Sequence, residues 1–202
     1  MGGSPTADPL SYPGDIPDQP FVLDHGEVSP LSRGRPSAPD MNERHLVVAV
    51  GSNAAPARLV EKLGPDAAVP VLLLRVVGMD VRYSAHVTRY GAVPTTAWPQ
   101  AGAALTLPAL LLDDVQLVAL DATEPNYDRV PLADVGVRLA SHEHQRRASI
   151  STYVTRRGWY RLESKEPALP PLRGTTAGRC GTVLGQRQVL ATVLAVARSA
   201  RP

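Results

Sequence analysis

Apolar residues occur along the chain in short runs separated by turn residues, and these runs predict its strands and helices. Residues 46–50 are apolar and partly β-branched, and residues 69–79 form a longer run of the same kind, so both predict buried strands. Between them, apolar residues at helical spacing follow Pro56, and Gly64-Pro65 is a typical helix stop. The pattern therefore predicts a strand, a short helix and a second strand in succession.

The next stretches also have the character of strands. Residues 81–90 alternate nearly as a half-buried strand does, and residues 92–96 continue the extended chain. Residues 102–107 predict another short strand, and Pro108 should keep its neighbourhood off a central ladder position because it lacks an N–H.

A helix follows. Asp113 with Gln116 three residues later is a capping-box pattern, and Pro125 disfavours the helical conformation at Glu124, where the helix should end. Beyond it we expect strands at 128–137 and 148–154, a strand or loop at 156–164, a loop at 169–181 and an amphipathic helix at 186–198.

These elements favour an α+β fold. Many short strands with two or three helices suggest a small barrel rather than a doubly wound sheet. Residues 1–42 hold eight prolines, so we expect a flexible tail there, although residues 21–28 could form a hairpin or lie along the domain. Residues 43–202 are then a single domain that ends in the amphipathic helix, because a chain of 202 residues with 44% hydrophobic content can bury one sizeable core.

Composition narrows the classes of protein. No apolar run reaches the ~18 residues that span a bilayer, and the N-terminus lacks the basic start and apolar core of a secretory signal. Cys180 is the only cysteine, which excludes an internal disulfide and a cysteine-rich metal site and fits a reducing compartment. We therefore expect a cytoplasmic protein without a membrane partner.

Charge is distributed unevenly. Residues 1–137 carry 9 basic and 16 acidic side chains, whereas residues 138–202 carry 12 basic and 3 acidic ones. A basic C-terminal third could attract nucleic acid or an acidic partner. Aromatic residues are only 4% of the chain, which argues against base-stacking surfaces, so we expect no nucleic-acid partner.

The turn Gly51-Ser52-Asn53 joins the first predicted strand to the first predicted helix. Glycine allows close backbone approach or a positive φ, and Ser52 and Asn53 are both good N-cap residues. The unpaired N–H groups at a helix N-terminus favour an anion, so this turn is a candidate site for a carboxylate, a phosphate or a developing oxyanion. On its own, however, Gly-Ser-Asn between a strand and a helix is more often a capped structural turn.

Three blocks of sequence resemble the gamma-glutamylcyclotransferase-like family. They are Val50-Gly51-Ser52-Asn53, the segment 81–96 with Pro94, and the helix ending Leu120-Asp121-Ala122-Thr123-Glu124, which Tyr127 follows. The family has a Tyr-Gly-Ser-Asn loop, a Pro-containing middle strand and a Leu-Asp-x-x-Glu helix end followed by a tyrosine. The likeness covers residues 45–155, and the chain departs from it at Val50, in place of the loop tyrosine, and at Pro125, in place of a glycine.

The resemblance implies a small closed β-barrel of about six strands with flanking helices. It implies an acyltransferase or lyase that cyclises a γ-glutamyl amide or amine to 5-oxoproline and releases an amine or amino acid. Glu124 would be the general acid and base. The substrate-binding residues would come from the loop and two tyrosines: Val50, Gly51, Ser52, Asn53, Tyr90 and Tyr127. The partner would be a small γ-glutamyl compound, and no metal or organic cofactor is required.

Other interpretations stay open. The chain could be a binding module without turnover on the same fold, or an interaction protein that uses its basic C-terminal third; the oligomeric state is also open. His142 and His144 would share one face of a strand, as in a metal site, but no third ligand is evident. Ser84 and His86 would share a strand face, although no acid orients them as in a serine hydrolase. Without the resemblance, Glu124 would read as a solvated carboxylate or a partner of Arg129.

Overall fold

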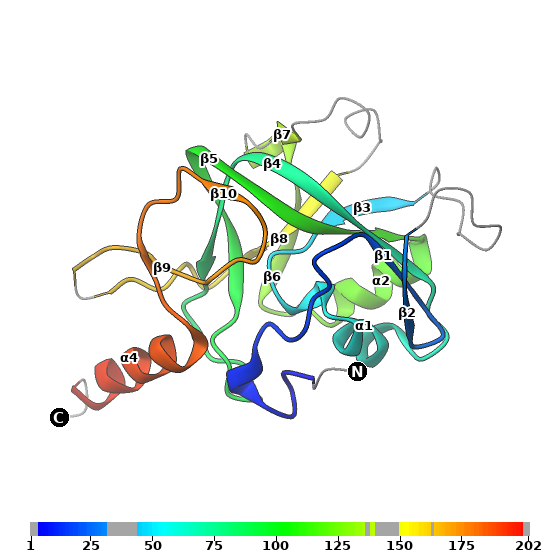
Figure 1. Ribbon diagram of the computed structural model, residues 1–202. Coiled ribbons are helices and arrows are strands. Elements are labelled where there is room, and N and C mark those ends of the chain that lie inside the picture. The colour runs from blue at the N-terminus through cyan, green and yellow to red at the C-terminus, as the bar shows by residue number, and fades with distance from the viewer. Residues whose placement is uncertain (1–3, 32–43, 136–137, 140–149, 163, 200–202) are drawn as a thin grey trace.

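A long antiparallel hairpin, formed by β4 (Val69–Tyr83) and β5 (Thr95–Leu112), is the centre of the fold. Figure 1 shows this hairpin in the structure, which is a computed structural model. The structure describes residues 4–31, 44–135, 138–139, 150–162 and 164–199. The other strands are β1 (Phe21–Asp24), β2 (Glu27–Pro30), β3 (His45–Val48), β6 (Tyr127–Pro131), β7 (Arg138–Leu139), β8 (Ile150–Thr155), β9 (Ala168–Leu169), β10 (Thr176–Ala177) and β11 (Thr182–Val183). The helices are α1 (Pro56–Leu63), α2 (Asp114–Ala122) and α4 (Gln186–Ser199), with 3-10 turns η1 (Pro9–Ser11), η2 (Ser52–Ala54) and η3 (Ala133–Val135).

Nine of these strands form one mixed sheet in the described part of the chain. Its order is β2-β1-β4-β5-β3-β8-β6, with β10 paired to β5 and β7 paired to β4. The β3–β8 pair is parallel, and the pairs β4–β5, β3–β5 and β6–β8 are antiparallel. The α+β class is as expected.

The sheet is not closed, so the prediction of a closed barrel of about six strands is wrong. At one end β6 pairs only with β8, and the chain then leaves the ladder at the turn η3. Among the described residues it next pairs as the short β7, which lies against β4. Because no continuous ladder joins β6 to β4 among the described residues, the two ends of the sheet do not meet as strands.

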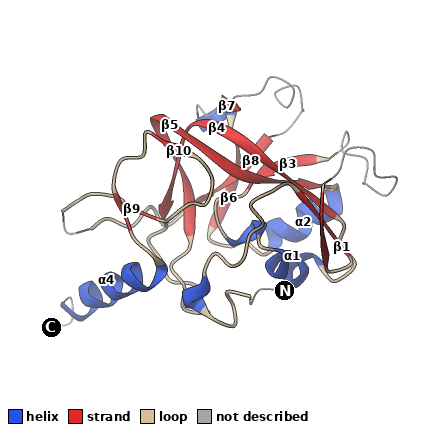
Figure 2. Cartoon of the chain, in the orientation of Figure 1, coloured by secondary structure: helices blue, strands red, loops and turns tan. Residues whose placement is uncertain are grey.

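Both faces of the sheet are buried, because neighbouring strand residues point to opposite sides. Val47 in β3 and Leu110 in β5 pack on the face that α1 and α2 cover, whereas Leu46 and Leu111 pack on the other face. Figure 2 shows α1 and α2 close together at one side of the sheet. This packing fixes α1 and the end of α2, which border the candidate site.

Several elements confirm the sequence predictions. The structure contains β3, α1, β4 and α4 where the apolar pattern predicts them. In α2 the capping box is complete: the Asp113 carboxylate accepts from the Gln116 N–H at 2.8 Å, and the Gln116 side chain accepts from the Asp113 N–H at 3.2 Å. The segment 81–90 is a strand only as far as Tyr83.

The position of Pro108 in the sheet differs from the one predicted from the sequence. It lies within β5 opposite Leu73 of β4, so the expectation that it keeps its neighbourhood off a central ladder position is wrong. Its carbonyl accepts from the Ala49 N–H at 2.9 Å, just past the end of β3. Since the nitrogen and carbonyl of one strand residue point to the same side, the missing N–H faces the end of β3, where no ladder bond is needed.

The N-terminal segment contributes to the sheet. The hairpin expected at residues 21–28 is confirmed as β1 and β2, and β1 pairs with β4 through Phe21, Val22 and Leu23. Phe21 and Leu23 are buried in the core beneath α1 and α2. Residues 4–31 therefore lie against the domain, which matters for the site described below.

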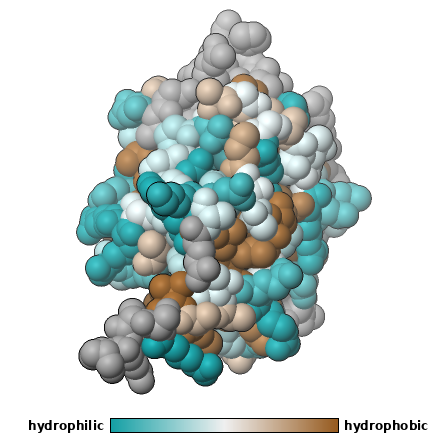
Figure 3. Space-filling view, turned by 90° about the vertical axis from the view of Figure 1, so that its left-hand side faces the viewer, coloured by the Kyte–Doolittle hydropathy of each residue, from teal (hydrophilic) through white to brown (hydrophobic). Residues whose placement is uncertain are grey.

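The C-terminal helix covers a third, smaller cluster. Val189 of α4 is fully buried near Tyr83, whereas Leu194 and Val196 are 55% and 42% exposed. Figure 3 shows the side of the molecule on which α4 lies, where apolar patches alternate with hydrophilic residues. No helix in the described ranges is both long enough and apolar enough to cross a bilayer.

Candidate functional site

A cavity of about 520 Å³ lies between the end of β3, helix α1, the end of α2 and the start of β5. All the site residues predicted from the sequence line it: Val50, Gly51, Ser52, Asn53, Tyr90, Glu124 and Tyr127. The cavity is also lined by further polar and aromatic side chains: Tyr12, Arg58, Lys62, His86, Arg89, Thr95 and Tyr153. The structure thus brings together residues from five separate parts of the sequence.

The loop after β3 forms one wall. Gly51 has φ −150°, so it is needed for close approach and not for a positive φ: a Cβ there would lie 2.3 Å from the Tyr12 hydroxyl. Neither Ser52 nor Asn53 caps α1, whose N-cap is Ala55 without a side-chain bond and whose first residue is Pro56. The expected capping role is wrong because the Asn53 side chain binds across the cavity.

The backbone of this loop keeps free donors. Within the described residues, the N–H groups of Gly51, Ser52 and Asn53 donate to no acceptor of the protein. Unpaired amides beside a cavity favour a negatively charged or strongly polar ligand atom.

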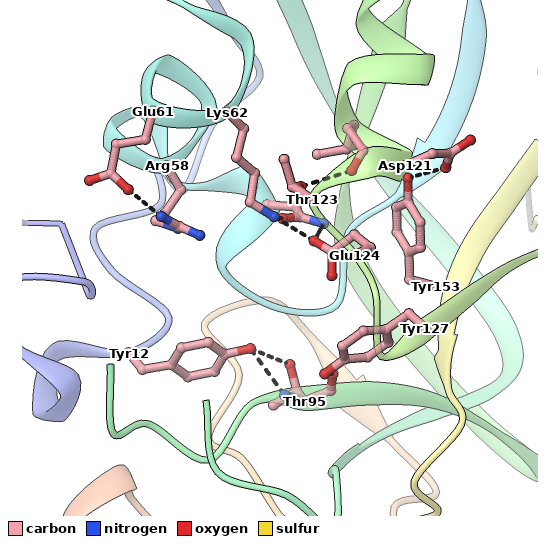
Figure 4. A network of polar contacts seen from close by, with 12 residues as sticks. Tyr12, Arg58, Glu61, Lys62, Thr95, Asp121, Thr123, Glu124, Tyr127 and Tyr153 are labelled. Atoms are coloured by element: carbon pink, nitrogen blue, oxygen red, sulfur yellow. Dashed lines mark hydrogen bonds and ion pairs between the residues drawn. The ribbon is translucent and has the colours of Figure 1, made fainter. Parts of the chain in front are cut away.

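Glu124 faces the loop from the end of α2. Thr123 is the C-cap of α2, and a turn then carries Glu124, whose side chain is only 13% exposed. The carboxylate atom Oε1 accepts from Asn53 Nδ2 at 3.0 Å and from Lys62 Nζ. Oε2 makes no hydrogen bond within the part of the chain that the structure describes, and Figure 4 shows one carboxylate oxygen pointing away from Lys62 toward Tyr12 and Tyr127. One oxygen is therefore held and the other is available.

Lys62 completes a triangle with Asn53 and Glu124. Its ammonium group donates to Asn53 Oδ1 at 2.7 Å and to Glu124 Oε1, and its side chain is 6% exposed. Burial lowers the pKa of Lys62, and the Glu124 carboxylate opposes that shift. Two of the three ammonium protons are used, so one donor remains.

Sequence reasoning missed Lys62. It lies three residues after Leu59, which is fully buried, and therefore on the same side of α1. A lysine on the core side of a short helix, beside the candidate loop, is the signal that identifies it.

The remaining walls hold tyrosines. Tyr127 donates to the Thr95 carbonyl at 3.0 Å, and Tyr153 donates to Asp121 at 2.6 Å. Burial raises the pKa of both phenols well above the ordinary value, so they act as neutral donors. Asp121 also pairs with Arg129 at 3.0 Å, so the interpretation of Glu124 as a partner of Arg129 is wrong.

His86 lines the cavity and packs edge-on against Tyr127, with 5.9 Å between ring centres. Its Nδ1 lies 2.8 Å from the Ser84 hydroxyl, which itself donates to Thr155 at 2.7 Å. Because Ser84 is fully buried and gives its proton to Thr155, it is not placed as a nucleophile. Burial and the charge of Arg157 lower the pKa of His86, so its ring is neutral near pH 7.

Positive charge predominates around the cavity. Arg58, Lys62 and Arg89 line it, whereas Glu124 is the one acidic side chain that lines it among the residues that the structure describes. Arg58 pairs with Glu61, which lies outside the lining, and its guanidinium is 5.7 Å from the centre of the Tyr90 ring. The site can therefore hold an anionic ligand and still offer one carboxylate for proton transfer.

Within the described residues, no group of three or more His, Cys, Asp or Glu side chains could hold a metal ion. The candidate pair His142 and His144 lies outside the described residues. Comparison of the chain with models of protein families, with curated proteins and with solved structures finds no match.

Proposed function

We propose that this protein is a cyclotransferase-type enzyme that converts a γ-glutamyl amide to 5-oxoproline and a free amine. The observation that carries the proposal is that Glu124 and the Gly51-Ser52-Asn53 loop line one cavity and are joined by a 3.0 Å hydrogen bond. The proposal rests on this site and on the resemblance in the loop and helix-end motifs. It does not rest on the fold, because the sheet is open.

The reaction needs proximity and proton transfer. The α-amino nitrogen of the substrate attacks its own γ-carbonyl carbon, a C–N bond forms, and a five-membered lactam closes. The bond from that carbon to the leaving nitrogen then breaks. The attacking ammonium loses two protons as it becomes the lactam N–H. One is delivered to the leaving nitrogen to release the amine, and the other protonates that amine to an ammonium ion, so no water, oxidant or reductant is consumed.

Glu124 is suited to carry a proton from the attacking nitrogen to the leaving nitrogen. Its Oε1 is fixed by Asn53 and Lys62, which leaves Oε2 to accept from the substrate ammonium and to donate later to the leaving group. Asn53 and Lys62 are therefore positioning residues for the carboxylate.

The negative groups of the substrate would meet donors. The free amides of Gly51, Ser52 and Asn53 could stabilise the oxyanion or bind the α-carboxylate. The remaining ammonium proton of Lys62 and the guanidinium of Arg58 add positive charge on the same side of the cavity. Tyr90 and Tyr127 would enclose the γ-glutamyl chain.

One observation favours a second candidate, a binding module without turnover. The ion pair with Lys62 neutralises Glu124, as a purely structural carboxylate would require. In that case the same cavity would bind an anionic small molecule without changing it.

The deciding experiment incubates the protein with a panel of γ-glutamyl amides, amines and dipeptides and measures 5-oxoproline by mass spectrometry. We expect product from at least one compound, and a loss of about a hundredfold or more in Glu124→Gln. Glu166→Gln is the matched control, because Glu166 is exposed, its side chain accepts from Thr182 at 3.0 Å, and it does not line the cavity. Ligand-dependent thermal stabilisation without product would favour the binding module, and product formation undiminished in Glu124→Gln would overturn the mechanism.

We also propose that the enzyme works in the cytoplasm. Its single cysteine, Cys180, is a free thiol exposed to solvent, which fits a reducing compartment.

A further inference from the structure

The N-terminal segment brings a tyrosine into the candidate site. Tyr12 directly follows η1, and its hydroxyl reaches Thr95, a residue 83 positions away at the start of β5. The Thr95 N–H donates to the Tyr12 hydroxyl at 3.0 Å, and the two side-chain oxygens are 2.9 Å apart. Tyr12 thus meets both the backbone and the side chain of one cavity residue (Figure 4).

The direction of these bonds is fixed by counting protons. The Thr95 hydroxyl donates its one proton to the Val50 carbonyl at 2.7 Å. The phenol proton of Tyr12 must therefore point to Thr95 Oγ1. A chain of hydrogen bonds runs from Tyr12 through Thr95 to the carbonyl that precedes Gly51.

The loop is shaped to receive this hydroxyl. A Cβ on Gly51 would lie 2.3 Å from the Tyr12 oxygen and 2.6 Å from Thr95 Oγ1, so the phenol occupies the space that any other residue would need. Burial raises the pKa of Tyr12 well above its ordinary value, which keeps the donor protonated. Tyr12, Val50 and Gly51 also line a second cavity of about 470 Å³.

The segment that carries Tyr12 is itself attached. Asp8 accepts from the Leu10 N–H at 3.0 Å as the N-cap of η1, and Thr6 donates to Glu61 of α1 at 3.0 Å. On the far side, β1 is paired with β4. Tyr12 is therefore held from both directions along the chain.

We propose that Tyr12 is a positioning residue of the site, which sets the Val50–Gly51 backbone and with it the loop amides that face the ligand. On this view Tyr12 belongs to the site, and the N-terminal segment that carries it is not a detached tail. The effect on turnover rests on the proposed function, whereas the effect on the loop does not.

The test compares Tyr12→Phe, which removes only the hydroxyl, with the matched control Tyr83→Phe. Tyr83 is a buried phenol that donates to the Leu184 carbonyl at 2.9 Å, outside the candidate cavity. Amide hydrogen exchange and amide chemical shifts report on Thr95 and on the loop without any ligand. We expect about tenfold faster exchange at Thr95 and shifted resonances at Gly51–Asn53 in Tyr12→Phe only.

Kinetics give the second measurement if the wild type forms 5-oxoproline. We expect Tyr12→Phe to raise KM about tenfold while its midpoint of thermal unfolding moves no more than that of Tyr83→Phe. If Tyr12→Phe does not fold, Thr95→Val breaks the same chain at its middle, and Thr95→Ser should restore it.

The outcomes separate the two proposals. Unchanged exchange and loop resonances overturn the positioning role, whether or not the protein is an enzyme. Altered loop resonances with unaltered KM and kcat in an active enzyme overturn it too. Altered resonances in a protein that forms no product uphold the positioning role and count against the proposed function.

Discussion

The buried pair of Lys62 and Glu124 can be tested by its contribution to stability. The two side chains are 6% and 13% exposed, and both also bind Asn53, at 2.7 and 3.0 Å. The perturbation is a cycle of three variants: Lys62→Met, Glu124→Gln and the two together. Each single change leaves a buried charge without its ionic partner.

The expected magnitude follows from that geometry. Removing one partner of a buried ion pair typically costs about 3–5 kcal/mol in the free energy of unfolding. Because Asn53 remains beside either charge, we expect a lower value of about 2–3 kcal/mol for each single variant. The double variant leaves no unpaired charge, so it should cost about 2 kcal/mol less than the sum of the single variants.

Urea unfolding followed by circular dichroism measures the cycle, with unchanged m-values as the sign that the comparison is valid. The matched control is the exposed pair of Arg156 and Asp128, for which we expect a coupling of about 0–1 kcal/mol. If the Lys62–Glu124 coupling is as small as that of the control, the two charges are not paired in solution. The carboxylate would then lack the fixed orientation that the proposed mechanism needs.

Three further predictions concern single residues. Gly51→Ala places a Cβ 2.3 Å from the Tyr12 oxygen and should cost about 1–3 kcal/mol in urea unfolding; an unchanged midpoint would contradict the close approach. The pKa of His86, measured by NMR, should lie below the ordinary value of 6.5. Because the unfolded state then binds a proton at a higher pH than the folded state does, the free energy of unfolding should fall as the pH drops below about 6.5, and less so in His86→Asn. Leu120→Ala empties a fully buried position and should cost about 2–5 kcal/mol, whereas a loss below about 1 kcal/mol would argue against the packing of α2.

The local elements could be predicted because their signals are local. The capping box of Asp113 and Gln116 and the apolar run of β4 depend only on neighbouring residues. The closure of the sheet could not be predicted, because it depends on whether a continuous ladder of strand pairs joins β6 to β4. The turn η3, where the chain leaves the ladder after β6, interrupts that ladder. Pro108 shows the same limit, since its position in a central strand is tolerated only because β3 ends beside it.

Some residues of the candidate site could likewise be predicted from the sequence, and others could not. The loop residues and Glu124 could be named because they form contiguous motifs, and they do line one cavity. Tyr12 could not be named, because its proline-rich surroundings are typical of a tail and its partner Thr95 is distant in sequence. A single phenol in such a segment has no pattern that distinguishes it.

Thr95 is the residue on which the shape of the cavity depends. All three of its polar groups are engaged away from Glu124: the N–H with Tyr12, the hydroxyl with Val50 and the carbonyl with Tyr127. In the described part of the chain, no hydrogen bond links Thr95 to Glu124. The hydrogen bonds of Thr95 and the carboxylate of Glu124 can therefore be changed separately by mutation. Variants of Thr95 should disturb the Val50–Gly51 backbone and leave the ion pair of Glu124 intact, whereas Glu124→Gln, which keeps an oxygen to accept from Asn53, should lower turnover without moving that backbone. A change at either residue that produced both effects would mean that one network, and not two, controls this cavity.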